Sequence, residues 1–203
     1  FSTDTQIENL LQEMPAISLD EMSGIRLMKR TDTKFLANKA QLLQVLALAK
    51  DDYYVQEIHH KRIARYRTTY WDSNDYFFFR MHEQGRRPRT KVRVRTYEDS
   101  DGLTFLEVKK KDNHGKTRKK RIEVVSQKEV FESGGDEFVA KQTQHSLNLF
   151  HPCLQNYFKR ITLVNKGKTE RLTIDYDVEY TNFDTGQRAT SDQLVIIELK
   201  RDG

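Results

Sequence analysis

The order of hydrophobic and polar residues predicts helices in three places and strands over most of the remaining chain. Apolar residues recur at the spacing of an amphipathic helix over residues 4–14, 38–50 and 126–150. Asn38 stands where a helix N-cap is expected, and Pro15 ends the first helix. Gly134-Gly135 divides the third region into two pieces, and a short helix or loop is expected over residues 74–85.

Eight further segments alternate apolar and polar residues, as strands with one buried face do. They are residues 24–36, 63–73, 90–98, 103–111, 118–125, 156–164, 169–180 and 192–200. Asp101-Gly102 and Asn113-His114-Gly115 predict tight turns between consecutive strands. Because helices interrupt the strands in only two places, the pattern predicts an α+β fold with a closed eight-stranded antiparallel β-barrel flanked by helices.

Length and composition suit one globular domain with a small addition. The 203 residues are 36% hydrophobic and 32% charged, with 11 Phe and 9 Tyr that argue against disorder. We expect residues 1–26 to form an N-terminal helical segment and residues 27–203 the barrel domain. The one cysteine, Cys153, excludes an intrachain disulfide, argues against a cysteine-based metal site and is interpreted as a packing residue. A cytoplasmic setting is expected, with the inner face of a membrane as the alternative.

Period-two spacing gathers the charged residues on one face of the strands. That face holds Asp32, Lys34, Arg67, Lys91, Arg93, Arg95, Glu107, Lys109, Lys111, Lys119, Arg121, Arg160, Arg171, Asp175, Glu198 and Lys200. The opposite face holds Val92, Val94, Leu106, Val108, Ile161, Ile174 and Ile197. Either the charges face solvent around an apolar lumen, or helices cover the apolar face and the cations line the lumen. Lys or Arg on every strand, and helices that need an apolar surface, favour the second arrangement.

A lumen lined by many cations predicts a dense polyanion as its ligand. Like charges in close contact repel one another by several kcal/mol at an effective dielectric constant of about 20, and an anion relieves this repulsion. Glu107 and Glu198 are acidic exceptions on this face. They either pair with neighbouring bases or hold Mg²⁺ or Mn²⁺ together with substrate phosphates.

Seven segments follow one another along the chain: RTDTKFL, YRTTYWDS, KVRVRTY, FLEVKKK, TRKKR, FKRITL with ERLTID, and VIIELK. In this order they resemble the strands of the VTC domain, the catalytic domain of the vacuolar transporter chaperone polyphosphate polymerase and its bacterial relatives. The family belongs to the triphosphate tunnel metalloenzymes, together with the CYTH branch. The first segment stands where the CYTH branch has Glu-x-Glu-x-Lys, which favours the VTC branch. Relatives usually continue past the last strand with further tunnel lysines near a Ser-Lys-Tyr motif, and this sequence has no such segment.

The resemblance implies roles for individual residues. Tunnel bases that bind the triphosphate are expected at Lys34, Arg93, Arg95, Lys109, Arg160 and Arg171, and Lys119 and Arg121 complete the wall. Glu198 matches the metal-binding glutamate. We therefore expect catalytic roles for Arg93, Arg95, Lys109 and Arg171, metal binding by Glu198 and Glu107, and substrate binding by Lys34, Arg67, Lys91, Lys111, Lys119, Arg121, Arg160 and Lys200.

The function implied is transfer of the ATP γ-phosphate to a growing polyphosphate chain, with Mn²⁺ or Mg²⁺. Fixed cations and a metal suffice for such phosphoryl transfer by electrostatic stabilisation. Hydrolysis of triphosphate or polyphosphate, and a non-catalytic polyphosphate sensor, remain alternatives. Nucleic acid is not expected as a partner, because the bases follow one strand face rather than an open stripe with stacking aromatics. A membrane-protein partner is a further expectation, and the oligomeric state stays open.

Overall fold

The computed structural model describes residues 1–25, 27 and 30–202. Its contacts divide the chain into two compact units, here called unit 1 and unit 2. Unit 1 comprises Phe1–Arg65, Phe158–Val178 and Thr190–Gly203, and unit 2 comprises Tyr66–Tyr157 and Glu179–Ala189. The expected boundary after residue 26 stays a prediction, because Arg26 lies outside the described residues.

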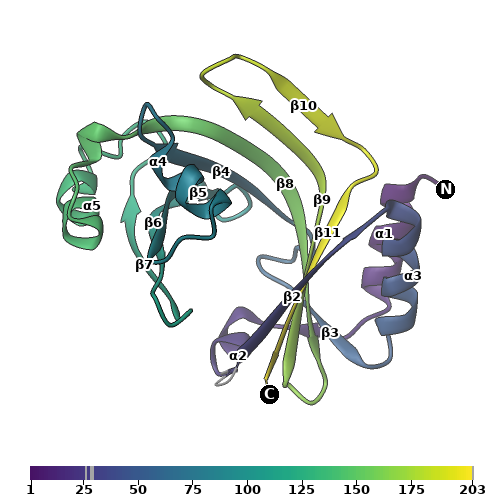
Figure 1. The fold of residues 1–203 in the computed structure, drawn as a ribbon. Helices are drawn as coiled ribbons and strands as arrows, with labels where there is room; N and C mark the ends of the chain where they lie inside the picture. Colours follow the sequence, from purple (N-terminus) through teal and green to yellow (C-terminus); the bar gives the residue numbers. More distant parts are fainter. Residues whose placement is uncertain (26, 28–29, 203) are drawn as a thin grey trace. The chain divides into compact units, whose positions relative to one another are not determined.

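Unit 1 contains three helices and most of the strands near the two ends of the chain (Figure 1). They are α1 (Thr3–Gln12), β1 (Ala16–Ile17), α2 (Leu19–Ser23), β2 (Arg30–Ala37), α3 (Lys39–Ala49), β3 (Tyr53–Gln56), the later part of β8 (His151–Asn165), the earlier part of β9 (Glu170–Asn182) and β11 (Val195–Asp202). β11 pairs antiparallel with both β2 and β9, and β3 pairs antiparallel with β8 and parallel with β1.

Unit 2 contains the middle of the chain. Its elements are β4 (Ala64–Asp72), α4 (Phe77–Glu83), β5 (Arg89–Tyr97), β6 (Leu103–Lys111), β7 (Thr117–Val124), α5 (Gly135–Thr143), the short 3-10 helix η1 (Leu147–Leu149), the start of β8, the end of β9 and the start of β10 (Arg188–Ser191). β4, β5, β6 and β7 form an antiparallel sequence of neighbours joined by short connections. Both turn predictions at residues 101–102 and 113–115 are confirmed.

The strands do not close into a barrel. The hydrogen-bonded order is β2-β11-β9-β8-β4-β5-β6-β7 in a sheet of 11 strands, with β1, β3 and β10 attached beside this path. Within the described residues, β7 and β2 end the path unpaired with each other. The expected closed eight-stranded barrel is therefore wrong in strand number and in closure, whereas antiparallel strands with flanking helices are confirmed. The three additional strands have two to four residues, which is too short for alternation to reveal them.

Local signals position the helices much as the sequence predicts. Asn38 caps α3 by accepting from the Gln41 amide at 2.8 Å, and the Gln41 side chain accepts from the Asn38 amide at 2.9 Å. α1 begins at Thr3, one residue before the expected start, because the Ser2 side chain caps it by accepting from the Thr5 amide. α5 begins at Gly135, so the glycine pair marks a helix start and the residues before it form turns.

Helices cover the apolar face of the strands in each unit. In unit 1, α1 and α3 lie side by side and pack on the strands (Figure 1). This core contains Ile7, Leu11, Leu42, Leu46, Ile161, Leu163, Ile174, Tyr176, Val195 and Ile197. In unit 2, α5 and η1 pack on β5, β6 and β7 through a core containing Trp71, Val92, Val94, Leu106, Val108, Val124, Val139 and Leu147. The prediction that helices take the apolar face is confirmed. No helix in the described part of the chain is long and apolar enough to cross a membrane.

Candidate anion-binding site

Strand register gathers one face of charged residues in unit 2, here called the unit 2 cationic face. Residues directly opposite in an antiparallel pair point to the same side of the sheet. Arg93 is opposite Glu107 on β6, which in turn is opposite Arg121 on β7, and Lys109 lies between Lys91 and Lys119. With the next residues along these strands, the face comprises Lys91, Arg93, Arg95, Glu107, Lys109, Lys111, Lys119 and Arg121.

Glu107 is the buried centre of this face. Its side chain is 1% exposed, with Oε1 2.7 Å from Arg93 Nε and Oε2 3.4 Å from Lys119 Nζ. Burial alone would raise the pKa of Glu107, but the cations of Arg93 and Lys119 outweigh it and hold this pKa below its ordinary value. Oε1 accepts a hydrogen bond from Arg93, whereas Oε2 is buried without a hydrogen bond and has only the ion-pair contact with Lys119. These two cations favour the ion-pair alternative for Glu107.

β4 contributes aromatic and hydroxyl groups to the same face. Thr68 is opposite Arg95 and Tyr70 is opposite Arg93. Arg95 is 7% exposed, its Nε donates to Thr68 Oγ1 at 2.9 Å, and its guanidinium lies 5.5 Å from the ring centroid of Tyr66. Although burial raises the pKa of Tyr70, the charges of Arg93 and Arg95 lower it overall. These contacts fix the two arginines before any anion arrives.

The expectation that Arg67 joins the cationic face is wrong. Arg67 is opposite Thr96, on the side of the sheet that packs against the helices, and its Nη2 is 2.8 Å from Glu98 Oε1. The prediction followed the basic residues along β4, whereas the register to β5 turns Tyr66, Thr68 and Tyr70 toward the cations. Sequence reasoning missed these three because strand tyrosines and threonines are usually interpreted as core or surface.

Register also decides between neighbouring lysines. Lys119 lies on the cationic face with Glu107, whereas Lys120 is opposite Val108 on the helix side. On β6, Lys109 shares the cationic face, and Lys110 Nζ instead donates to the Gln142 carbonyl of α5 at 2.9 Å. Each pair therefore offers two lysines, adjacent in sequence, with opposite orientations.

Unit 1 has a cationic face of its own. Glu198 on β11 is opposite Lys34 on β2, and Lys200 is opposite Arg171 on β9. Glu198 lies 3.7 Å from Lys34 Nζ and 3.5 Å from Lys200 Nζ. Arg160 on β8 donates to both carboxylate oxygens of Asp175, at 2.7 and 2.9 Å. The predicted unit 1 residues Lys34, Arg160, Arg171, Glu198 and Lys200 thus lie on neighbouring strands.

Asp177, a second carboxylate on β9, forms ion pairs with two lysines. Asp177 Oδ1 is 2.7 Å from Lys39 Nζ and Asp177 Oδ2 is 3.0 Å from Lys159 Nζ. Burial would raise the pKa of Asp177, and the hydrogen bonds from the two lysines lower it overall. Asp177 therefore ties the start of α3 to β8 and β9.

The two carboxylates proposed for metal binding differ in access. The Glu198 side chain is 23% exposed, and the amines of Lys34 and Lys200 lie 3.7 and 3.5 Å from its carboxylate oxygens. The Glu107 side chain is 1% exposed and has a direct hydrogen bond from Arg93. Glu198 is therefore the more accessible of the two carboxylates, and metal binding at either residue stays a prediction.

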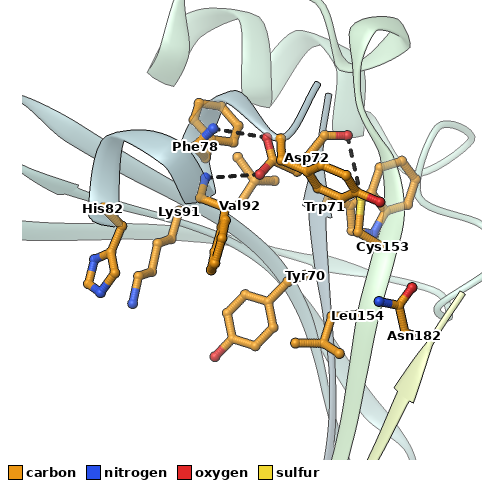
Figure 2. A pocket seen from close by; sticks show the side chains of 12 residues that line it. Tyr70, Trp71, Asp72, Phe78, His82, Lys91, Val92, Cys153, Leu154 and Asn182 are labelled. Atoms are coloured by element: carbon orange, nitrogen blue, oxygen red, sulfur yellow. Dashed lines mark hydrogen bonds between the residues drawn. The ribbon is translucent and has the colours of Figure 1, made fainter. Parts of the chain in front are cut away.

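A cavity of about 550 Å³ adjoins the cationic face within unit 2. Figure 2 shows Tyr70 and Lys91, which belong to or border that face, among its lining residues, with Trp71, Phe78, Leu154 and Asn182 supplying apolar and amide surface. Its upper wall is fixed by Asp72, whose carboxylate accepts from the amides of Phe78 and Phe79 at 3.0 Å each. The only sequence signal for this cavity is the aromatic run in residues 76–79, and a run without alternation predicts neither a strand nor a cavity.

Comparisons with known proteins agree with this architecture. The family model of the VTC domain matches residues 29–203. A Bacillus halodurans protein described as a "putative adenylate cyclase" has a TM-score of 0.51 and 11% identity, over 87% of this chain and 83% of that chain. A Hippeastrum protein, described as a "putative adenylyl cyclase" with a dominant triphosphatase activity, has a TM-score of 0.50 and 14% identity, over 87% and 80%. These identities show the fold alone. No match was found among curated proteins.

Proposed function

Because the chain belongs to the VTC domain family, we propose that it transfers the γ-phosphate of ATP to a growing inorganic polyphosphate chain. The observation that carries the proposal is the unit 2 cationic face, where the buried Arg95, the largely buried Arg93 and more exposed lysines share one side of three strands. Such a surface suits a chain of phosphates, because each phosphate adds charge at a regular interval and contributes no apolar surface.

In this proposal the buried arginines are the fixed charges of the site. Glu107 and Thr68 hold Arg93 and Arg95 in place, so these guanidinium groups need little reorganisation when charge develops on the transferring phosphoryl group. Lys91, Lys109, Lys111, Lys119 and Arg121 would bind the rest of the phosphate chain. Lys34, Arg160, Arg171 and Lys200 would bind phosphate at the cationic face of unit 1.

Glu198 is the residue that we propose for the metal, Mn²⁺ or Mg²⁺. One carboxylate plus phosphate oxygens is a usual coordination for Mg²⁺ in phosphoryl transfer, and the ion would neutralise charge on the phosphates. Lys34 and Lys200 would then be released from Glu198 to contact phosphate. Glu107 takes a positioning role through Arg93 and Lys119 rather than a metal-binding role.

Hydrolysis of triphosphate is the second candidate function. It is favoured by one observation, the triphosphatase activity in the description of the Hippeastrum protein with the same fold. The two reactions differ in the group that accepts the phosphoryl: a polyphosphate end for the polymerase and water for the hydrolase.

The test uses a pair of lysines that differ in orientation and share a strand. Lys109→Gln removes a cation from the proposed site, and Lys110→Gln removes the same charge from the helix side of β6. The proteins are incubated with ATP and Mn²⁺ or Mg²⁺, polyphosphate is resolved on gels, and released phosphate is measured in parallel. We expect chain growth in the unaltered protein and in Lys110→Gln, and a loss of roughly tenfold or more in Lys109→Gln.

The outcomes separate the candidates. Phosphate release without chain growth would replace the polymerase with the hydrolase. Metal-independent binding of tripolyphosphate without turnover would leave the sensor alternative. If Lys109→Gln and Lys110→Gln lost the same amount of activity, the cationic face would not be the active surface. The two variants have the same net charge and differ only in the face of the sheet from which the lysine is removed. Glu198→Gln should abolish the activity that depends on Mn²⁺ or Mg²⁺. The variant should still bind tripolyphosphate in the presence of a chelator.

A further inference from the structure

A group of three metal-ligating side chains lies in unit 2, apart from the charged residues of the cationic face. Nε2 of His151 and Sγ of Cys153, both at the start of β8, approach a carboxylate oxygen of Asp184, in the turn after β9. His151 Nε2 is 3.0 Å from Asp184 Oδ1 and 3.4 Å from Cys153 Sγ, and the three donor atoms lie within 4.8 Å of one another.

The separations of His151 Nε2 from Asp184 Oδ1 and from Cys153 Sγ, 3.0 and 3.4 Å, are close to the edges of a tetrahedral metal site. Zn–N and Zn–O bonds of about 2.0–2.2 Å and a Zn–S bond of about 2.3 Å put ligand atoms roughly 3.3–3.6 Å apart. Small side-chain movements would therefore bring the three donors to coordination distance. Imidazole, thiolate and carboxylate together form a donor set that Zn²⁺ prefers and that Mg²⁺ does not.

The surroundings hold the three donors in position. The Phe183 amide donates to the Cys153 carbonyl at 2.9 Å, which joins the turn to β8. Asn182 Oδ1 accepts from the Asp184 amide at 3.0 Å. The Tyr76 hydroxyl donates to the second oxygen of Asp184, Oδ2, and leaves Oδ1 directed at His151. Hydrogen bonds of this kind to a ligating carboxylate are usual around protein metal sites.

The geometry argues against a nucleophilic cysteine. In a relay of cysteine, histidine and aspartate, the two partners bind opposite nitrogens of the imidazole ring. Here Cys153 Sγ and Asp184 Oδ1 both approach Nε2, so the carboxylate cannot orient the ring toward the thiol. Burial, aided by the charge of Asp184, also raises the pKa of the Cys153 thiol to about 11. A thiol with such a pKa is a poor nucleophile without a nearby cation.

We propose that His151, Cys153 and Asp184 form a zinc site with Nε2, Sγ and Oδ1 as its three protein ligands. Zn²⁺ would replace the shared polar contacts at Nε2 and bind Cys153 as a thiolate, with the thiol proton released to solvent. It would fasten the turn after β9 to the start of β8 beside the cavity, since Cys153, Tyr76 and Asn182 all line that cavity. The single cysteine argued against a cysteine-based site, and sequence spacing hid this mixed set because His151 and Asp184 are 33 positions apart.

Cobalt spectroscopy tests this site without any measurement of activity. The protein is prepared without a histidine tag, reduced, treated with a chelator and titrated with Co²⁺. Because the chain has 1 cysteine, a thiolate-to-cobalt charge-transfer band can arise from Cys153 alone. We expect this band, together with intense tetrahedral d–d bands, to saturate at about one equivalent and to be displaced by Zn²⁺.

Variants assign the remaining ligands. Cys153→Ser should abolish the charge-transfer band, and His151→Gln or Asp184→Asn should weaken binding at least tenfold. Tyr76→Phe removes only the supporting hydrogen bond and should weaken zinc binding about 10–100-fold. His114→Gln, in the turn before β7, and Glu198→Gln should leave the spectrum unchanged. Circular dichroism of each variant checks that it is folded.

Three results would overturn the proposal. One is the absence of a charge-transfer band in the folded, reduced protein, a result that does not depend on any variant. Another is a band that survives both His151→Gln and Asp184→Asn. The third is saturation at half an equivalent with a doubled molecular mass, which would place the metal between cysteines of two copies. Because the polymerase test uses neither Co²⁺ nor variants of His151, Cys153 or Asp184, failure of one proposal does not imply failure of the other.

Discussion

Neutralising Glu107 tests whether this carboxylate holds the cationic face together. In Glu107→Gln the largely buried Arg93, 18% exposed, loses its charged partner at 2.7 Å, and Lys119 loses its partner at 3.4 Å. Removing one member of a buried ion pair costs roughly 3–5 kcal/mol, because the other charge stays buried. Glutamine keeps the volume and one acceptor for Arg93 Nε, so we expect a loss near the lower end, about 3 kcal/mol.

The assay follows from the position of the single tryptophan. Trp71 is 7% exposed in the core of unit 2, so its fluorescence during urea denaturation reports on the unit that contains Glu107. Glu123→Gln is the matched control, since Glu123 is exposed and lies opposite Phe105 on the neighbouring strand. An exposed substitution of this kind should change stability by no more than about 0.5 kcal/mol.

The same variant separates the two roles considered for Glu107. If Glu107 only positions cations, its removal leaves the face more positive, and tripolyphosphate in the presence of a chelator should bind about tenfold more tightly, equivalent to about 1.4 kcal/mol. Excess tripolyphosphate should then restore part of the lost stability by binding the folded state. Unchanged stability would refute the ion-pair argument. If the variant bound tripolyphosphate normally in a chelator but lost the metal-dependent part of that binding, Glu107 would be a metal ligand.

Three further predictions follow from single contacts. Asp177→Asn should lower the free energy of unfolding by roughly 1.5–3 kcal/mol at neutral pH, because two charged hydrogen bonds are lost. Circular dichroism during denaturation measures this change. Asparagine tolerates the φ of 50° at this position, so the backbone adds no strain. The pKa of Asp177 is lowered in the folded state. The stabilisation by its carboxylate is therefore complete above the ordinary aspartate pKa and is lost as pH falls through the folded pKa. If the variant stayed less stable than the unaltered protein in acid, the ion pairs of Asp177 would not be the cause. Gly135→Ala should cost about 1–3 kcal/mol in urea, because its Cβ would stand 2.5 Å from the Val130 carbonyl oxygen, whereas Gly24→Ala, at 3.7 Å from its nearest atom, should be nearly neutral. In titration calorimetry, Lys119→Gln should weaken tripolyphosphate binding several-fold and Lys120→Gln much less; equal effects would contradict the register-based orientation.

Alternation predicted the orientation of the charges wherever a strand was long and strongly patterned. On β5 and β6, Val92, Val94, Leu106 and Val108 face the helices, and the intervening charged residues face away, as expected. A run of four cations such as residues 118–121 has no apolar residue to fix its phase, so only pairing with β6 decided between Lys119 and Lys120.

The failures have physical causes that one sequence does not expose. Arg67 was assigned to the cationic face because β4 carries tyrosines and threonines on one side and Trp71 on the other, and either side could be the core by composition. Barrel closure depends on how the first and last strands meet, which local alternation does not encode. The buried role of Glu107 was one of two stated alternatives, and the hydrogen bond from Arg93 was needed to favour it.

β7 ends the hydrogen-bonded strand path and pairs only with β6 among the described residues, so one of its edges is available to another strand (Figure 1). Open edges invite a second copy to add its own strand and begin aggregation, and lysines on an edge strand are a common protection. Arg118, Lys119, Lys120 and Arg121 give this edge four consecutive positive charges. Two such edges repel each other, so the cations that we propose for phosphate binding would also keep the protein from aggregating through β7. The protection would weaken wherever polyphosphate is in excess, because the anion would neutralise both edges at once.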